Sequence, residues 1–141
     1  MTRLLLGTNV VSEATKIRPD PAALAWLASQ QLDACFLSVL TLGEIQFGIS
    51  RLAPSVRQSE LTRWLHMELI PTFRDRMLPF DRDAALAWGA LSALAVSQGK
   101  ALPIVDSQIA ATAKAQGLTL VTRNLRDFSG LGIDLVNPWE S

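Results

Sequence analysis

Short apolar segments alternate along this chain with longer segments whose apolar residues recur at helical spacing. Runs rich in Leu, Val or Phe at 4–6, 35–39, 118–121 and 135–136 predict β-strands, and the stretch 77–80 is a further candidate. Helix-forming residues predict helices between them, at 22–29, 42–51, 59–68, 84–97 and 107–116. A strand that is followed repeatedly by a helix implies a parallel sheet covered on both faces, and hence an α/β fold.

Proline and glycine mark where these elements end. Gly99 and Gly117 follow the last two predicted helices, as expected of residues that terminate a helix. The stretch 51–58 contains Pro54 and predicts the loop of a helical hairpin. No repeat, low-complexity tract or linker interrupts the 141 residues, so we expect one compact domain spanning 1–141.

Composition limits the classes of partner. Thirteen Lys and Arg residues balance thirteen Asp and Glu residues, so a site for a polyanion must be a local patch. The single cysteine, Cys35, lies in an apolar run and predicts a buried thiol in a reducing, hence cytoplasmic, compartment. The N-terminus does not match a signal peptide, and the most apolar segment, 84–96, is shorter than the ~20 residues that cross a bilayer. We therefore expect no membrane association.

Polar residues come soon after the predicted strands, where open parallel sheets bind their ligands. Glu44 lies one turn into the helix after the second strand, and Asp106 opens a later helix. Four separate segments could therefore converge on one pocket. The remaining polar residues follow the first strand and the strand 118–121: Thr8, Asn9, Thr122, Arg123, Asn124 and Asp127.

Each acid also has a structural explanation. Thr41 and Glu44 match a capping box, in which both side chains satisfy free backbone N–H groups at a helix start. Asp106 could stabilise a helix N-terminus through the helix dipole. Asn124 and Asp127 could cap a turn before the segment FSGLG. Only the convergence of all four residues favours a functional site over these separate roles.

A divalent cation would resolve the repulsion between carboxylates that meet in one pocket. All the candidate ligands are oxygens, whereas the only histidine, His66, lies on an amphipathic helix and is expected at the surface or at the boundary of the core. That donor set favours Mg²⁺ or Mn²⁺ over zinc. Such an ion polarises a phosphoryl oxygen and activates water, which is a common route to phosphodiester hydrolysis.

Several segments together resemble a known family. They are TNVVSE after the first strand, SVLTLGEIQFGI, and the long stretch PIVDSQIAATAKAQGLTLVTRNLRDF. Their order resembles the PIN-domain family, specifically the VapC-like toxins of bacterial toxin–antitoxin pairs and their FitB-like relatives. The resemblance covers essentially the whole chain. It implies a three-layer α/β/α sandwich with a small parallel sheet, and a Mg²⁺-dependent endoribonuclease that cleaves RNA.

The resemblance also implies roles for individual residues. The acid of the second family motif falls on Glu44, and the acid that opens the IAATA helix falls on Asp106. The polar residue after the last motif strand falls on Asn124, with Asp127 as a possible substitute. Thr8, Asn9 and Thr122 match polar residues that hold the acids and the metal-bound waters in place.

Position 7 departs from the family pattern. The family motif begins DTN, whereas this chain reads GTN, so Gly7 stands where the first metal-binding aspartate is expected. A backbone requirement such as a positive φ is one explanation. Loss of the metal ligand, by natural or deliberate change, is the other, and it predicts a nuclease that is crippled as written.

A PIN-like module that binds RNA or protein without catalysis is the alternative function. A small-molecule or phosphoryl-accepting domain is disfavoured because no Gly-rich phosphate loop is present.

Partners follow from the same resemblance. We expect a cognate VapB- or FitA-like antitoxin, a homodimer, and a hetero-oligomer that binds operator DNA through the antitoxin. The helices at 42–52 and 59–70 are candidate walls for an apolar antitoxin segment, unless their side chains belong to the core. Their exposed-looking residues are Phe47, Ile49, Trp64 and Leu65. The candidate contacts to RNA phosphates are Arg51, Arg123 and Arg126.

Overall fold

The computed structural model describes residues 2–140. Within them, five short strands pair in the order β3-β2-β1-β4-β5, and every pair is parallel. The central strand β1 pairs Leu4 with Cys35 of β2 on one side and with Thr119 of β4 on the other. The strands are β1 (Leu4–Leu6), β2 (Cys35–Ser38), β3 (Met77–Leu78), β4 (Thr119–Val121) and β5 (Leu135–Val136).

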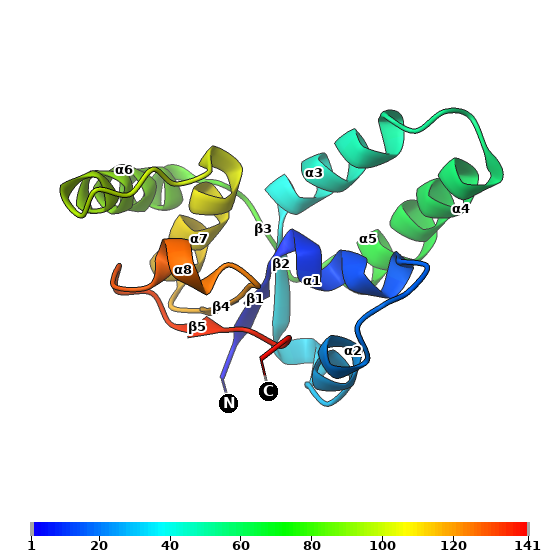
Figure 1. Ribbon diagram of the computed structural model, residues 1–141, viewed down its shortest axis with the longest axis horizontal. Helices are drawn as coiled ribbons and strands as arrows, with labels where there is room; N and C mark the ends of the chain where they lie inside the picture. The colour runs from blue at the N-terminus through cyan, green and yellow to red at the C-terminus, as the bar shows by residue number, and fades with distance from the viewer. Residues whose placement is uncertain (1, 141) are drawn as a thin grey trace.

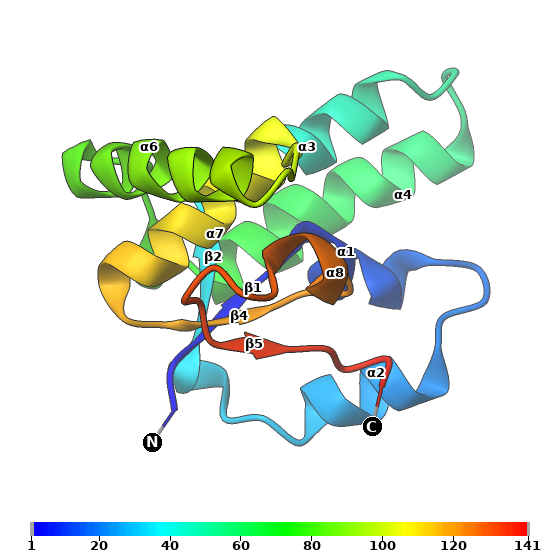
Figure 2. The same cartoon turned by 60° about the vertical axis from the view of Figure 1, so that its left-hand side comes forward.

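Helices cover both faces of this sheet, which confirms the predicted three-layer α/β/α sandwich (Figure 1). One layer contains α6 (Arg82–Ser97), α7 (Ile104–Gln116) and the short α8 (Leu125–Phe128), and α6 lies across α7 (Figure 2). The other contains α1 (Thr8–Ser12), α2 (Pro21–Ala28), α3 (Val39–Ser50), α4 (Val56–Trp64) and α5 (Ile70–Thr72). Shorter turns are η1 (Glu13–Thr15), η2 (Leu32–Ala34) and the π-helical turn η3 (Leu65–Leu69) that continues α4.

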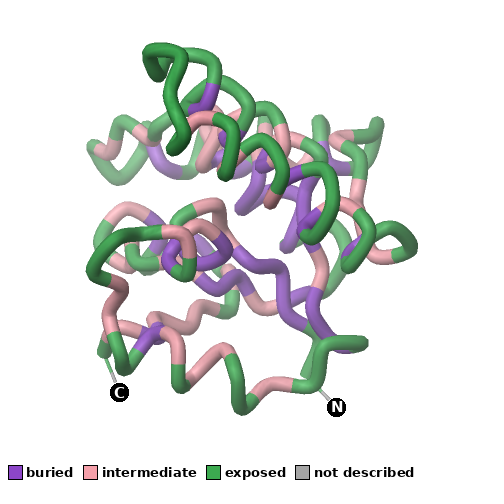
Figure 3. Tube along the Cα trace, turned by 90° about the vertical axis from the view of Figure 1, so that its right-hand side faces the viewer, coloured by how far each residue is buried: buried purple, intermediate pink, exposed green. Residues whose placement is uncertain are grey.

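The leucines of β1 divide the core into two halves. Leu4 and Leu6 pack with residues of α1, α3 and η3, whereas Leu5 packs with residues of α6 and α7. Successive side chains of a strand point to opposite faces, so three consecutive leucines serve both layers. This central strand is buried along its whole length, as the purple trace inside the molecule shows (Figure 3).

Most predicted elements are confirmed, with shifts at their ends. α3 begins at Val39, inside the predicted strand 35–39, because the Ser38 hydroxyl accepts a hydrogen bond from the Leu40 N–H and caps the helix. Gly117 ends α7 in the left-handed conformation, at φ 67°. The helices α1 and α8 were not predicted, since segments of five and four residues carry too little periodicity.

The structure also tests two expectations that were based on composition. Cys35 is a buried free thiol, as predicted, and burial raises its pKa. Among the residues that the structure describes, no helix is both long enough and apolar enough to cross a membrane.

A buried carboxylate ties the end of α1 to the carboxyl-terminal segment. Glu13 is only 2% exposed. Its carboxylate accepts hydrogen bonds from Lys16 Nζ at 3.1 Å, the Asp20 backbone N–H at 3.2 Å and Trp139 Nε1 at 3.1 Å. Burial alone would raise the pKa of this carboxyl, but the hydrogen bonds and the charge of Lys16 outweigh it. The pKa of Glu13 therefore lies below its ordinary value.

We predict that Glu13→Gln lowers the free energy of unfolding at neutral pH by about 1–3 kcal/mol, because it weakens hydrogen bonds to a buried charge. A carboxyl whose pKa is lowered in the folded state contributes stability above its ordinary value of 4.5, and this is lost as the pH falls through the folded value. The difference between wild type and variant should therefore shrink in acid. Urea denaturation over a pH series measures it, and a difference that does not change with pH would contradict the assignment.

Candidate active site

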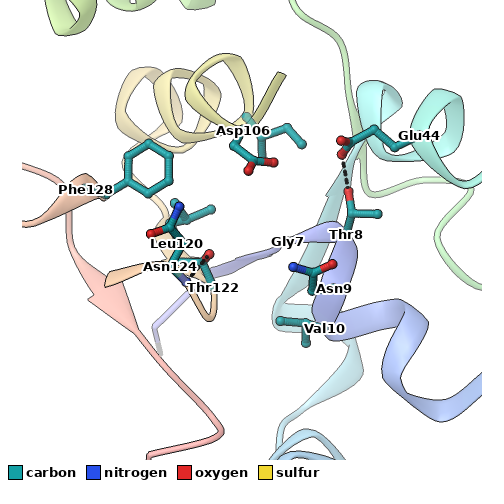
Figure 4. A pocket seen from close by; sticks show the side chains of 11 residues that line it. Gly7, Thr8, Asn9, Val10, Glu44, Asp106, Leu120, Thr122, Asn124 and Phe128 are labelled. Atoms are coloured by element: carbon teal, nitrogen blue, oxygen red, sulfur yellow. Dashed lines mark hydrogen bonds between the residues drawn. The ribbon is translucent and has the colours of Figure 1, made fainter. Parts of the chain in front are cut away.

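A cavity of ≈ 180 Å³ opens at the carboxyl ends of β1 and β4 (Figure 4). The strand order reverses there, because the chain runs from β1 to β2 and β3 on one side before it reaches β4 on the other. Open α/β sheets bind ligands at such a point. The residues that line the cavity are Gly7, Thr8, Asn9, Val10, Glu44, Asp106, Ile109, Leu120, Thr122, Asn124 and Phe128.

The cavity brings together most of the residues that the sequence nominates. The four predicted segments converge, and Asp127 adjoins the lining through its hydrogen bonds to Asn124. Val10, Ile109, Leu120 and Phe128 were not nominated, since apolar residues at these positions look like ordinary core. The lining contains none of the three candidate arginines, Arg51, Arg123 and Arg126.

On the α3 side of the cavity, Glu44 is held by two threonines. The Thr8 hydroxyl donates to Glu44 Oε1 at 2.6 Å, and the Thr41 hydroxyl lies 3.1 Å from Thr8 Oγ1. Because a hydroxyl has a single proton, Thr41 is the donor to Thr8. The predicted capping box is therefore wrong: Ser38 caps α3, and Thr41 is a fully buried residue inside the helix. The spacing of Thr41 and Glu44 places both on the face that meets α1.

On the opposite side, Asp106 projects from the first turn of α7, facing Glu44 across the cavity (Figure 4). Burial raises its pKa, and the negative charge of Asp127 raises it further. Asp127 is held by Asn124, whose Nδ2 donates to Asp127 Oδ2 at 2.7 Å and whose Oδ1 accepts the Asp127 N–H. Asn124 therefore caps α8, and the Thr122 hydroxyl accepts the Asn124 N–H in turn.

No basic side chain neutralises these acids. The ion pairs within residues 2–140 join Lys16 to Glu13 and Arg82 to Asp83, both outside the cavity. The described residues also include no group of three or more His, Cys, Asp and Glu side chains close enough to enclose a metal ion. What remains is a pair of carboxylates, Glu44 and Asp106, with hydroxyl and amide oxygens beside them. This donor set suits a cation that takes one or two carboxylates and keeps several waters, as Mg²⁺ does.

Gly7 lies where β1 and β4 approach each other. Its φ of −67° and ψ of 160° are open to any residue, so the explanation by a positive φ is wrong. The Gly7 N–H donates to the Val121 carbonyl at 2.8 Å, and a Cβ on residue 7 would lie only 2.9 Å from the same oxygen. A side chain at position 7 therefore requires the backbone of one strand to move.

Two of the four proposed antitoxin contacts are not exposed. Ile49 and Leu65 are 5% and 2% exposed, so the expectation that they lie at the surface is wrong. They belong to the core that packs on Leu4 and Leu6. Phe47 is 64% exposed, and Trp64 is partly buried at a second, apolar cavity of ≈ 340 Å³. His66 is exposed, as predicted.

Comparison with known proteins decides the family. The family model for the PIN domain matches residues 4–132, which is nearly the whole chain. The chain belongs to the PIN-domain family. This PIN domain is 39% identical over 137 residues to a VapC ribonuclease, Y4jK, of Sinorhizobium fredii, with 97% of this chain and 98% of that protein covered. It is 35% identical over 136 residues to the toxin FitB of Neisseria gonorrhoeae, with 96% and 98% covered.

Solved structures agree with this assignment. FitAcB from Neisseria gonorrhoeae matches this PIN domain with a TM-score of 0.93 and 34% identity, covering 98% of this chain and 99% of that chain. A structure of FitAB bound to the IR36 DNA fragment has the same TM-score at 33% identity, with 98% and 96% covered. A toxin–antitoxin complex from Klebsiella pneumoniae matches with a TM-score of 0.72 and 26% identity, with 98% and 99% covered.

We predict that Gly7→Ala lowers the free energy of unfolding by about 1–3 kcal/mol, because the added methyl group meets the Val121 carbonyl. Gly48→Ala is the matched control, since a Cβ there meets nothing within 4 Å and α3 continues through it. That control should gain about 0.5–1 kcal/mol from helix propensity. Urea denaturation of the three proteins measures both effects. Equal stability of Gly7→Ala and wild type would show that the backbones of β1 and β4 can shift apart at residue 7 without a cost in free energy.

Proposed function

We propose that the protein is the ribonuclease toxin of a toxin–antitoxin pair, and that it cleaves RNA phosphodiester bonds in the cavity at the ends of β1 and β4. The observation that carries the proposal is the convergence of unneutralised acids at this point of a PIN fold. Similarity over nearly the full length to a protein named a VapC ribonuclease supports the same activity. An RNA substrate also supports a cytoplasmic location.

We propose Mg²⁺, or Mn²⁺ in its place, as the cofactor. Glu44 and Asp106 would hold it, because they are the two carboxylates that line the cavity and no cation neutralises either. When bound, the ion polarises a phosphoryl oxygen and lowers the pKa of a water molecule. A bound cation would also oppose both causes of the raised pKa of Asp106, which are its burial and the negative charge of Asp127.

The remaining side chains have positioning roles in this proposal. Thr8 orients Glu44 by donating to Oε1, which leaves Oε2 free to contact the metal ion. Asn124 keeps the charge of Asp127 beside Asp106, and Thr122 orients Asn124. Asn9 lies at the exposed edge of the cavity, where it can contact bound water or substrate.

Gly7 leaves the site short of one carboxylate, so we propose that cleavage is crippled in the protein as written. Mg²⁺ binding at a site with few protein ligands depends strongly on each carboxylate. A misplaced water costs further rate, on the order of 10²-fold for an error of about 1 Å. The alternative is a non-catalytic PIN-like module that binds RNA or protein.

We predict that the Gly7 protein shows little metal-dependent cleavage of a structured RNA, and that Gly7→Asp raises cleavage about 10²-fold. Adding Asp106→Ala to Gly7→Asp should abolish the gain. The assay compares the three proteins with Mg²⁺ or Mn²⁺ and with EDTA, together with growth of the expressing cells. Circular dichroism comes first, because the new side chain must displace the Val121 carbonyl.

The outcomes separate the two functions. Strong EDTA-sensitive cleavage by the Gly7 protein would show that the first carboxylate is dispensable. A folded Gly7→Asp variant that neither cleaves RNA nor slows growth would favour the binding module. If Gly7→Asp does not fold, Asp106→Ala in the Gly7 background decides, because residual cleavage that survives this change does not come from the cavity.

We also propose a VapB- or FitA-like antitoxin that places an apolar segment in the second cavity. This cavity lies between α2, η2 and η3 and is lined mainly by apolar side chains, among them Leu27, Leu32, Trp64 and Phe73. An apolar helix or strand of a partner fits such a groove. Named toxin–antitoxin complexes among the similar structures support this partner, and the DNA-bound FitAB structure supports operator binding through it.

We predict that co-expression with the adjacent open reading frame yields a stable complex, and that Leu32→Arg weakens it at least tenfold. Leu32 is 55% exposed and lines the second cavity, so a charge there meets the apolar partner segment. Val56→Arg is the control, since Val56 is 75% exposed and lies outside this cavity. Affinity capture followed by titration measures the effect. Equal binding by both variants would place the antitoxin elsewhere.

We propose that the protein also forms a homodimer. α6 has no charged residue between Ala84 and Ser97, and its outward face exposes apolar side chains, including Leu86 and Leu94. An uncharged face can pack on its own copy about a two-fold axis. Light scattering at micromolar concentration tests the oligomeric state.

A further inference from the structure

Arg123 lies between two residues that line the active-site cavity, Thr122 and Asn124. It is exposed, and its guanidinium carbon lies 5.2 Å from the centre of the Trp139 ring. A guanidinium at this distance from an aromatic ring is held by a cation–π interaction. The Trp139 ring therefore restrains the Arg123 side chain, and the backbone of Arg123 lies between two residues of the cavity lining.

Arg123 differs from the other arginines that stack on aromatic rings. Arg3 and Arg76 also stack, but their guanidinium groups donate to backbone carbonyls. Arg51 stacks on Phe47, which is itself 64% exposed, at the far end of α3. The Arg123 guanidinium donates no hydrogen bond to any residue in the range 2–140, so none of its donors is satisfied by the described part of the chain. A guanidinium fork that is restrained by an aromatic ring matches the geometry of a phosphate.

Trp139 belongs to a strap, which we define as residues 137–139. Hydrogen bonds hold this strap against the rest of the molecule. The indole N–H of Trp139 donates to the buried carboxylate of Glu13, and its backbone N–H donates to Asn137 Oδ1 at 2.9 Å. Asn137 Nδ2 donates to the Arg123 carbonyl at 3.4 Å, and Pro138 is fully buried. The strap therefore holds Arg123 through both its backbone and its side chain.

We infer that Arg123 binds a backbone phosphate of single-stranded RNA at the rim of the cavity, and that Trp139 positions it for this contact. This inference rests on the proposed RNA substrate. Without a metal ion, Glu44 and Asp106 in the cavity repel phosphate, so a positive charge beside the cavity helps to hold the strand. A guanidinium that is already held by Trp139 loses less conformational freedom when it binds.

The experiment measures binding of a short fluorescein-labelled single-stranded RNA in EDTA, where the proposed cleavage does not occur. Fluorescence anisotropy over a series of salt concentrations yields the dissociation constant and its salt dependence. The variants are Arg123→Gln, Trp139→Leu, the double variant and Trp139→Phe. Arg74→Gln is the control, because Arg74 is exposed and lies outside the cavity. Urea denaturation checks that each variant is folded.

Arg123→Gln should weaken binding and reduce the slope of log K against log salt by about 0.7, the value for one phosphate contact to a single strand. Arg74→Gln should leave the slope unchanged. Trp139→Leu should weaken binding, whereas Trp139→Phe, which keeps a ring under Arg123 but loses the indole N–H that donates to Glu13, should weaken it less. The double variant should bind no more weakly than Arg123→Gln alone, because Trp139 acts through Arg123.

Each contrary result would overturn a different claim. If Arg123→Gln behaves like Arg74→Gln while the parent protein binds RNA, the phosphate contact is overturned and the proposed function stands. If the effects of Arg123→Gln and Trp139→Leu add, the positioning role of Trp139 is overturned. If Trp139→Leu does not fold, a folded Trp139→Phe that binds as weakly as Arg123→Gln overturns the role of the aromatic ring instead. If the parent protein does not bind RNA at all, both the inference and the proposed substrate fail.

Discussion

The parallel pairing of β1 with β4 is the contact on which the rest of the molecule depends. It places a strand of three leucines at the centre of the sheet, where Leu4 and Leu6 serve one half of the core and Leu5 serves the other. It also brings the residues after β1 beside those after β4, which creates the cavity. The same closeness leaves no room for a Cβ at Gly7. Gly7 therefore permits the close pairing of the two strands, and it is also the residue that, in the proposed function, leaves the site one carboxylate short.

The carboxylates on the two sides of the cavity differ in their hydrogen bonds. Glu44 accepts a short hydrogen bond from Thr8, and the buried Thr41 completes this chain. Asp106 accepts no hydrogen bond from any residue that the structure describes, and its pKa is raised by burial and by Asp127. A partly buried charge without a partner is costly. In the proposed function, Asp106 is therefore the side chain that would gain most from a bound cation.

Local patterns in the sequence were sufficient for the strands, for most helices and for the convergence of Glu44, Asp106 and Asn124. They failed where a decision depended on contacts distant in the chain. The capping motif at Thr41 looked complete, but Ser38 starts the helix three residues earlier because β2 ends there. Ile49 and Leu65 looked exposed, since spacing alone does not say which face of a helix meets the sheet. The bond between Glu13 and Trp139 joins distant segments, and no local pattern encodes it.

The pairing of β1 with β4 also has a consequence for synthesis of the protein. Leu4 pairs with Thr119, so the first strand emerges from the ribosome long before its neighbour exists. At roughly 5–20 residues per second, the nascent chain waits several seconds with its central strand incomplete. Contacts of such high sequence separation also form late in folding. A chain of this topology therefore assembles its acidic cavity only after β4 and the residues that follow it have been synthesised, so the proposed RNA-cleaving site cannot exist while the first hundred residues are being made.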